Sequence, residues 1–320
     1  MKRPARTTAR TTARTTVRNP DLRRLGTEKA NSASADLDRK SALEIAQIIN
    51  REDARVARAV KPALRQIAQA IDLIAEALAQ GGRLIYVGTG TSGRIAALDA
   101  VECPPTFNLD PRRVQFIIAG GIKALAAAVE ADEDSSELGR KGMAKKKPSS
   151  KDVVVGVTAS GRTPFTLAAI AYARARGART VAVVCNPKSP LGAAAHLAIV
   201  ADVGAEVVAG STRMKAGTAQ KMILNMLSTG AMARLGYVYG NLMVNVRPKN
   251  DKLAERGVSI LEKTAGLNRQ AARSLLTAAG GRVSVALVMA KANVHRAIAE
   301  AALRESENQV RKAITVARTM

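Results

Sequence analysis

The sequence predicts an α/β fold in which a doubly wound sheet of five parallel strands is covered by helices on both faces. Three observations support this class. Short apolar runs alternate with helical stretches, each run is almost continuously apolar as in buried parallel strands, and the intervening lengths suit crossover helices. The five predicted strands are residues 83–88, 114–120, 152–158, 180–185 and 197–203.

Helical patterns flank the predicted sheet. After Pro62, apolar residues recur at spacings of three and four, which indicates a helix with one buried face that ends at the Gln-Gly-Gly of 80–82. Residues 36–60 are also expected to be helical, and a long helix is expected over 212–236. The polar and basic run 139–150 is expected to form an exposed loop.

Three regions are expected along the chain. Residues 1–24 form a basic tail, residues 25–250 hold the sheet with its N-terminal helices, and residues 251–320 form a small helical domain. The last region shows only helical patterns, broken by Gly-Leu-Asn at 266–268 and by Gly-Gly-Arg at 280–282.

The composition favours a folded protein of a reducing compartment. Of the 320 residues, 47% are hydrophobic, which suffices for one large or two modest cores, although only 2% are aromatic. No apolar run reaches the roughly 18 residues of a membrane span. Two cysteines make no disulfide framework, which fits the cytoplasm.

The formal net charge of +24 is partly concentrated in the tail, where residues 1–24 carry eight basic side chains and one acidic side chain. The tail lacks the apolar stretch of a secretory signal, and its composition predicts disorder. A nucleic-acid-binding arm is the alternative. The low aromatic content argues against it, because single-stranded nucleic acids bind through stacking on aromatic rings.

The glycine-rich run Gly-Thr-Gly-Thr-Ser-Gly at 88–93 follows the first predicted strand and matches a dinucleotide-binding pattern. The second strand argues against that use, because it ends in Ala-Gly-Gly where an NAD site requires an acidic residue. The run is rich in hydroxyl groups and is followed by Arg94. Hydroxyls and amides at a helix N-terminus suit a terminal phosphate group, so the sequence predicts a phosphate site here.

Two further loops repeat this chemistry, at 158–165 after the third strand and at 210–221 before the long helix. Each places hydroxyl and basic side chains where a helix begins. The carboxyl ends of parallel strands meet at one edge of a sheet, so these loops are expected to converge on one crevice. The predicted substrate-binding residues are Thr91, Ser92, Arg94, Ser160, Arg162, Thr163, Ser211 and Lys215.

Six motifs together resemble the N-acetylmuramic acid 6-phosphate etherase family, whose core is a sugar isomerase (SIS) domain. The resemblance runs from about residue 25 to about residue 300 and is densest over 81–250. In chain order the motifs are YVGTGTSGR, LDAVECPPTF, IIAGG, ASGRTPF, GSTRMKAGTAQK and NLMVNV.

The resemblance implies a cytoplasmic lyase of peptidoglycan recycling that converts N-acetylmuramate 6-phosphate into N-acetylglucosamine 6-phosphate and D-lactate. It implies no metal or organic cofactor, a phosphorylated amino sugar as substrate and a homodimer. The family's two functional glutamates fall on Glu102 and Glu133. Two small departures are Thr89, where many members have Ala, and Phe165, where many have Tyr.

The implied reaction needs one proton acceptor and one proton donor. We assign Glu102 as the acid that protonates the departing lactyl oxygen and Glu133 as the base at C2. The helix that starts near residue 93 is expected to end near Val101, because Pro104 and Pro105 follow. The prolines would then hold Glu102 rigidly toward the crevice, and a donor carboxyl is expected to be partly buried.

Other interpretations are weaker. The acidic run 130–134 would by itself indicate a solvated face, so Glu133 depends on the resemblance. Cys103 has no histidine near it in sequence, and two lone histidines make a zinc site improbable. Glu206 and Asn241 are weaker candidates for the crevice.

Two alternative functions share the same fold. A sugar-phosphate-sensing regulator would need the phosphate loops but no acid or base, and an aldose–ketose isomerase would share only the abstraction of the C2 proton. A homodimer is expected to use the helix at 212–236 and the N-terminal helices as contacts.

Overall fold

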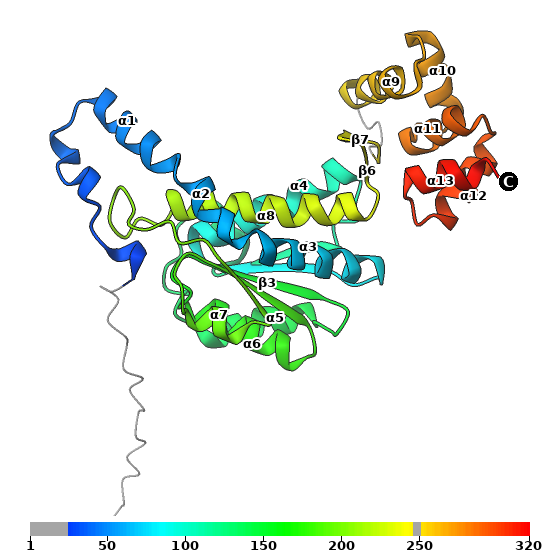
Figure 1. Ribbon diagram of the computed structural model, residues 1–320. Helices are drawn as coiled ribbons and strands as arrows, with labels where there is room; N and C mark the ends of the chain where they lie inside the picture. The colour runs from blue at the N-terminus through cyan, green and yellow to red at the C-terminus, as the bar shows by residue number, and fades with distance from the viewer. Residues whose placement is uncertain (1–24, 246–250) are drawn as a thin grey trace, which may run out of the picture.

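The computed structural model describes residues 25–245 and 251–320, so the predicted tail lies outside the described residues (Figure 1). A five-stranded parallel sheet with the strand order β2-β1-β3-β4-β5 forms its centre. This confirms the predicted fold class. The strands are β1 (Leu84–Gly88), β2 (Val114–Ile118), β3 (Val153–Thr158), β4 (Arg179–Val184) and β5 (Leu197–Val200).

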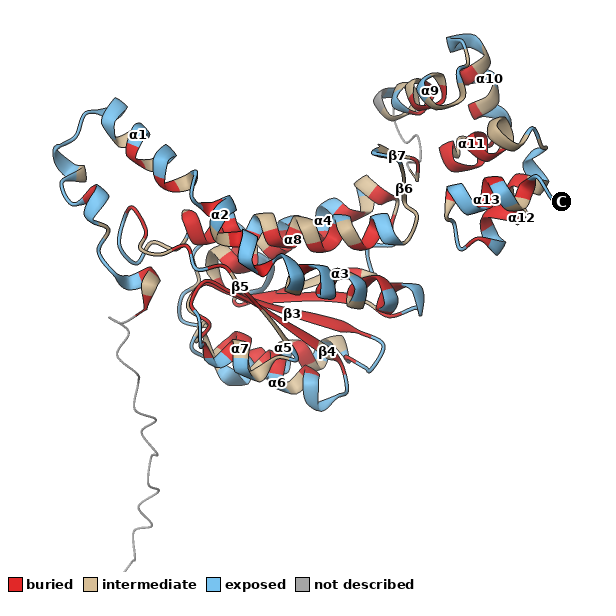
Figure 2. Cartoon of the chain, viewed as in Figure 1, coloured by how far each residue is buried: buried red, intermediate tan, exposed pale blue. Residues whose placement is uncertain are grey.

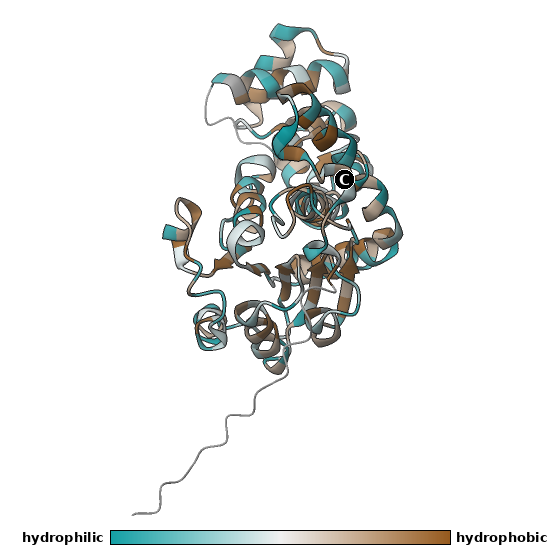
Figure 3. Cartoon of the chain, turned by 90° about the vertical axis from the view of Figure 1, so that its left-hand side faces the viewer, coloured by the Kyte–Doolittle hydropathy of each residue, from teal (hydrophilic) through white to brown (hydrophobic). Residues whose placement is uncertain are grey.

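Helices cover both faces of the sheet because successive strand residues point to opposite sides. Leu84 and Tyr86 of β1 belong to the core under one helix layer, whereas Ile85 and Val87 belong to the core under the other. The buried strands lie between the two layers (Figure 2), and they form a hydrophobic band when viewed from the side (Figure 3). One layer holds α3 (Leu64–Ala79), α4 (Gly90–Phe107) and α8 (Lys215–Arg234), and the other holds α5 (Ser136–Lys146), α6 (Pro164–Ala175) and α7 (Pro190–Ala194).

The N-terminal region is helical, as predicted, but it is divided. The helix α1 (Ala42–Asp53) begins with a capping box between Ser41 and Glu44, and a break at residues 54–55 separates it from α2 (Val56–Val60). The helix α1 projects from the domain, whereas α2 packs on α8 (Figure 1). Short 3₁₀ turns precede α1 at Gly26–Glu28, Ser32–Ser34 and Leu37–Arg39, and others lie at Lys61–Ala63 and Gly121–Leu125.

The prediction of an exposed loop over 139–150 is wrong, because most of this run belongs to α5. The Ser135 hydroxyl caps the helix by accepting a hydrogen bond from the Leu138 amide at 3.2 Å, and Met143 is fully buried. Gly139 lies so close to α6 that a Cβ there would be 2.0 Å from the Phe165 carbonyl oxygen. The buried face of α5 therefore contains too few apolar side chains to give a helical pattern in the sequence.

The prediction that the helix carrying Glu102 ends near Val101 is also wrong. The helix α4 continues through both prolines to Phe107, and Asn108 ends it in a left-handed conformation with φ of 53°. Cys103 and Phe107 are buried in the core. Their burial offsets the backbone hydrogen bonds that the two prolines cannot donate.

The C-terminal helices enclose a core of their own that includes Val244 and residues of all five helices. They follow a short hairpin of β6 (Val238–Tyr239) and β7 (Leu242–Met243). The division of the chain at residue 250 remains a prediction. The helices are α9 (Asp251–Ala265), α10 (Arg269–Ala278), α11 (Val283–Ala292), α12 (Arg296–Glu305) and α13 (Val310–Ala317).

Among the described residues, no single helix has the length and hydropathy needed to cross a membrane. The helices α10 and α11 meet both criteria only as a pair, and this pair is bent by 111°.

Candidate active site

A cavity of about 590 Å³ opens at the C-terminal ends of β1 and β3. This is the edge at which open parallel sheets bind their ligands. The structure brings six of the predicted residues together in its wall, namely Thr91, Ser92, Arg94, Glu133, Ser160 and Thr163. The wall also contains Glu28, Thr89, Gly90, Ala128, Val129, Glu130, Asp134, Thr158, Ala159, Gly210 and Thr212.

The turn between β1 and α4 forms one side of this cavity. The Thr89 side chain does not cap the helix, so amides of its first turn are available to a ligand beside the hydroxyls of Thr91 and Ser92. Gly90 has φ of +48°, and a Cβ there would lie 3.0 Å from the Glu133 Oε1 atom. The positive φ favours glycine at this position, and a Cβ would also crowd the nearby carboxylate.

The turn between β3 and α6 forms the opposite side. The hydroxyls of Thr158 and Thr163 are 2.8 Å apart, and the Ser160 Oγ accepts a hydrogen bond from the Arg162 amide at 3.1 Å. Gly161 has φ of +69° at the tightest point of the turn. The two turns therefore present hydroxyl groups toward the same space, as the two predicted phosphate loops require.

Glu133 is held between these two turns. Its backbone carbonyl accepts a hydrogen bond from the Phe165 amide at 3.1 Å, and its half-buried carboxylate lies beside Gly90. Burial raises the pKa of Glu133, and the charges of Asp134 and Glu130 raise it further. The Thr89 side chain lowers this pKa and offsets part of the shift. The site therefore contains a carboxylate that is more basic than an exposed glutamate.

Arg94 supports the segment that carries Glu133. Its guanidinium donates hydrogen bonds to the carbonyl oxygens of Ala124 at 2.9 Å and Ala127 at 2.7 Å. Both carbonyls lie in the connection from β2 to α5. Arg94 was predicted to bind substrate, and the structure gives it a direct role in fixing this connection at the edge of the cavity.

The structure does not bring Glu102 to this cavity. Glu102 lies twelve residues beyond Gly90 on α4, roughly 18 Å along the helix axis, and its side chain is exposed. The expectation of a partly buried carboxyl held by a helix end is therefore wrong for a single chain. The helix continues past Glu102, so its prolines do not orient it toward the crevice.

Lys215 also lies elsewhere. Its ammonium group forms a buried ion pair with Glu52 of α1 at 2.6 Å, and each side chain is 3% exposed. Glu206 accepts hydrogen bonds from the amides of Lys215 and Ala216, both at 2.9 Å, and so caps α8. Both residues anchor helices and do not contribute to the wall of the cavity.

The remaining predicted residues lie outside the wall. Ser211 stands between Gly210 and Thr212, which line the cavity, whereas Arg162 faces a neighbouring hollow beside Ser189. Asn241 lies in the turn between β6 and β7.

Sequence reasoning missed Glu28 and Thr158, which both line the cavity. Thr158 is the last residue of β3 and could have been found from its place at the strand end. Nothing in the sequence around Glu28 indicates a site, because only the tertiary fold brings that segment to the sheet.

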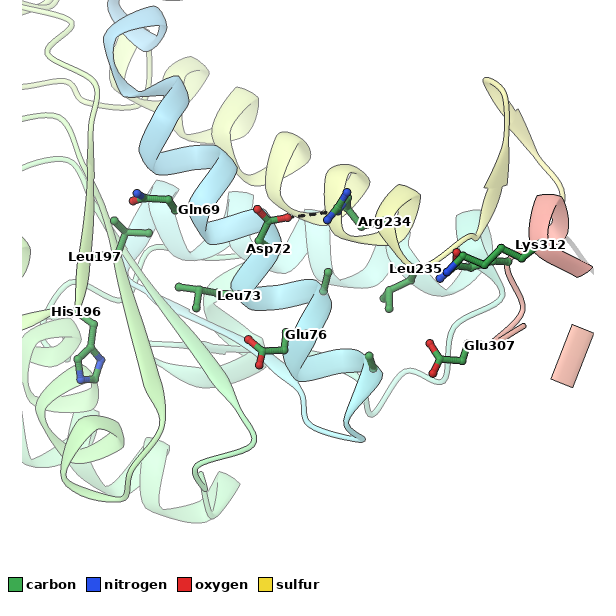
Figure 4. Close-up of a pocket in the computed structure, with 13 residues that line it drawn as sticks. Gln69, Asp72, Leu73, Glu76, His196, Leu197, Arg234, Leu235, Glu307 and Lys312 are labelled. Carbon is green, nitrogen blue, oxygen red and sulfur yellow. Dashed lines mark ion pairs between the residues drawn. The ribbon is translucent and has the colours of Figure 1, made fainter. Parts of the chain in front are cut away.

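A second cavity of about 990 Å³ lies beside the C-terminal half of α3 (Figure 4). Its wall contains His196, which directly precedes β5, together with an ion pair of 3.3 Å between Asp72 and Arg234. This position is at the N-terminal edge of the sheet and contains neither of the hydroxyl-rich turns. The smaller cavity is therefore the candidate active site.

The charge of the candidate site is unusual for an anion-binding pocket. Among the described residues, four carboxylates and one guanidinium line the cavity, and the carboxylates are Glu28, Glu130, Glu133 and Asp134. Across residues 25–245 and 251–320, no three His, Cys, Asp or Glu side chains are grouped as metal ligands. The site thus combines neutral, hydroxyl-rich turns with several carboxylates.

Comparisons with known domain families identify the class. The SIS domain family matches residues 137–230, and the glucokinase regulatory protein N-terminal SIS domain family matches residues 66–174. The five-stranded parallel sheet of this chain and the helices around it are therefore an SIS domain.

Full-length relatives identify the family. The chain is 48% identical to an N-acetylmuramic acid 6-phosphate etherase from Klebsiella aerogenes, over 92% of this chain and 98% of that protein. It is 47% identical to N-acetylmuramic acid 6-phosphate etherase 1 from Enterococcus faecalis, over 91% of this chain and 97% of that protein. The chain belongs to the N-acetylmuramic acid 6-phosphate etherase family.

Among solved structures, a phosphoheptose isomerase from Neisseria gonorrhoeae is 16% identical. The match covers 60% of this chain and 98% of that one, with a TM-score of 0.45.

Proposed function

We propose that the cavity at the C-terminal edge of the sheet binds N-acetylmuramate 6-phosphate and cleaves its D-lactyl ether. As a member of the etherase family, the protein is a carbon–oxygen lyase of cell-wall recycling and amino sugar catabolism. The observation that carries the assignment to this cavity is the position of Glu133, a carboxylate of raised pKa held between two phosphate-binding turns. The free thiols of Cys103 and Cys185 fit our proposal that the reaction takes place in the cytoplasm.

The chemistry requires a base close to C2 of the sugar. In the open-chain form, the C1 aldehyde acidifies the C2 proton, and its removal allows the C3–oxygen bond to break once an acid protonates the lactyl oxygen. Water then adds at C3 of the unsaturated aldehyde. Glu133 takes the C2 proton, because its raised pKa makes it a stronger base than an exposed glutamate.

The 6-phosphate binds between the two turns. The hydroxyls of Thr91, Ser92 and Ser160, with the first amides of α4, hold its oxygens. Arg94 keeps the connection that carries Glu133 in place through Ala124 and Ala127. This arrangement fixes the distance between the phosphate and the base, and therefore which sugar carbon lies beside Glu133.

Glu102 acts from the partner subunit of a homodimer. Within one chain it is too far from Glu133 for both to act on one sugar. On α4, Glu102 shares an exposed face with Leu98 and Val101, which are 50% and 54% exposed, and with Ile122 of the neighbouring turn at 70%. Such a face is suited to a second copy of this chain.

This dimer contact differs from the one expected from the sequence. The helix α8 is packed against α3 and α4 within the same chain, which leaves little apolar surface for a partner. The exposed face of α4 therefore offers a partner more apolar surface than α8 does. A contact there places Glu102 in the interface, where the partner's cavity can receive it.

The test is complementation between two inactive variants. Glu102→Gln and Glu133→Gln are unfolded and refolded together in equal amounts, and D-lactate release is assayed with N-acetylmuramate 6-phosphate. If each site takes one glutamate from each subunit, half of the dimers are mixed and each has one intact site, so about a quarter of the wild-type activity returns. Recovery of no activity would show that both glutamates of a site come from the same chain.

A further inference from the structure

The segment before α1 crosses the C-terminal edge of the sheet and borders the candidate active site. In Figure 1 it lies beside the loop that leads from β5 to α8. Thr27 in this segment is fully buried, although it lies close to the start of the described chain. A buried polar residue in such a position requires partners, and these show what the segment does.

Thr27 is joined to two loops of the site. Its hydroxyl accepts a hydrogen bond at 3.1 Å from the Asn186 Nδ2, which also donates to the carbonyl of Ala159 at 2.9 Å. Ala159 directly precedes Ser160. The carbonyl of Thr27 accepts a hydrogen bond from the amide of Gly210 at 3.3 Å. The backbone on either side of Thr27 is thus fixed relative to the cavity.

A second set of contacts fixes the continuation of the segment. The Ser34 hydroxyl donates to the Val207 carbonyl at 2.7 Å. The Asn31 side-chain amide donates to the Ala205 carbonyl at 3.2 Å and to the Glu52 carboxylate at 2.8 Å. Residues 27–34 are therefore attached at both ends to the loop that follows β5, and Glu28 lies between the two attachments.

Glu28 presents its carboxylate to the cavity. It belongs to the cavity wall, and its Oε2 lies 3.3 Å from the position a Cβ would take on Gly210. In the part of the chain that the structure describes, no hydrogen bond or ion pair to this carboxylate is found. An unpaired carboxylate repels a phosphate but accepts hydrogen bonds from hydroxyl or amide N–H groups.

We propose that Glu28 is a substrate-binding residue that accepts hydrogen bonds from hydroxyl groups of the sugar. The inference rests on the proposed function, because it requires the phosphate to occupy the turns at Ser92 and Ser160. The sugar then extends away from those turns along the acidic part of the wall. Glu28 takes no proton in the reaction. Its role is to orient the sugar so that C2 faces Glu133.

The test compares two ligands that differ only by the sugar. Affinities for N-acetylglucosamine 6-phosphate and for inorganic phosphate are measured by calorimetry with the full chain and with the variants Glu28→Ala and Glu28→Gln. The matched control is Asp38→Asn, because Asp38 is an exposed acidic residue of the same segment outside the cavity wall. Steady-state kinetics of D-lactate release are recorded for the same proteins.

Glu28→Ala is expected to weaken binding of the sugar phosphate by about 10- to 100-fold, the usual range for a hydrogen bond to a charged group. It should not weaken binding of inorganic phosphate, because removal of a carboxylate takes away a repulsion. Glu28→Gln retains one acceptor oxygen and should fall between Ala and wild type. In turnover, KM should rise more than kcat falls.

Three results would overturn the proposal. Unchanged affinity for both ligands would show that Glu28 does not reach the sugar, and an equal loss for both would show that it only supports the loops. A fall in kcat of about 100-fold with unchanged KM would make it an acid–base group. A failure of the proposed function is recognised separately, since Ser92→Ala would then leave the affinity for both ligands unchanged.

Discussion

Glu133 and Glu102 differ in how far the rest of the same chain surrounds them. Glu133 is half-buried, its backbone carbonyl accepts a hydrogen bond from the start of α6, and burial raises its pKa. Glu102 is exposed on an apolar helix face, with Leu98 and Val101 beside it. The residues that surround Glu133 all come from one chain. Glu102 instead lies on an exposed apolar face of the kind that packs against a second subunit. Under the proposed dimer, the motif around Glu102 identifies a residue without showing which subunit's site it serves.

The largest effect is expected from removing either titrating group. Glu133→Gln should lower D-lactate release by about 10²- to 10⁴-fold, the usual range for an acid–base residue. It should also abolish exchange of the C2 proton with deuterated solvent, because exchange needs the base. Glu102→Gln should lose cleavage to a similar extent and retain exchange, which NMR of the sugar measures directly.

The control for this pair is Asp132→Asn, which changes a carboxylate of the same acidic run outside the cavity wall and should leave both rates near those of the wild type. If Glu102→Gln abolished exchange and Glu133→Gln retained it, the two roles would have to be exchanged. Near-normal lactate release by both variants would instead show that neither glutamate is the acid or the base of the reaction.

A charge placed on the apolar face of α4 should disrupt the proposed dimer contact without changing the cavity. The double variant Leu98→Asp and Val101→Asp is expected to be monomeric and to lose about 10²-fold in activity, because the partner's Glu102 is then absent. Inorganic phosphate should still bind, since the two turns lie within one chain. Light scattering measures the molar mass, and calorimetry measures the affinity for inorganic phosphate.

Leu138→Asp is the matched control, because Leu138 is also an exposed leucine but lies on α5. A monomeric double variant with full activity would show that Glu102 is not needed across an interface.

Changes in the phosphate turns should have smaller effects. Ser92→Ala or Ser160→Ala is expected to raise KM by about tenfold with little change in kcat, because a hydrogen bond to a charged group is lost in the ground state as well as the transition state. Ser189→Ala provides the comparison, since Ser189 caps α7 and lies outside the cavity wall. Unchanged KM in both variants would remove these serines from the site.

The pH dependence should report on Glu133. The base acts when ionised, so kcat/KM is expected to fall as the pH drops through its raised pKa. Thr89→Val removes an interaction that lowers this pKa, and the acidic limb of the profile should therefore move to higher pH. A limb that stays in place or moves to lower pH would contradict the assignment of Glu133 as the base.

The same shift sets an expectation for stability. A raised pKa in the folded state means that Glu133 favours folding below its unfolded pKa and loses that contribution as the pH rises through its folded pKa. At neutral pH, Glu133→Gln should therefore melt no lower than the wild type. A scan of Tm against pH checks this and shows that the loss of activity is not a loss of folding.

The smallest effect is expected from the tail. Deletion of residues 1–24 should leave lactate release unchanged, because the described wall of the cavity begins with Glu28. A loss of more than about tenfold, which corresponds to roughly 1.4 kcal/mol, would show that the tail takes part in the reaction.

The sequence by itself determined the sheet and the hydroxyl-rich turns at its C-terminal edge. Nearly continuous apolar runs such as 114–118 and 153–158 predict buried parallel strands because both of their faces must be covered. Glycine and hydroxyl groups at strand ends predict turns such as Thr89–Ser92 because few other residues permit that backbone. These are local requirements, so they can be found in a few consecutive residues.

Only the tertiary structure decided where the remaining residues lie. Two prolines predict a helix end, but the burial of Cys103 and Phe107 keeps α4 continuous past Glu102. Lys215 is a residue type that commonly binds phosphate, yet Glu52, far away in sequence, pairs with it in the interior. Glu28 reaches the site because the bonds of Thr27 to distant loops bring it there. Such placements depend on which distant groups bury or neutralise a side chain, and local sequence does not contain that information.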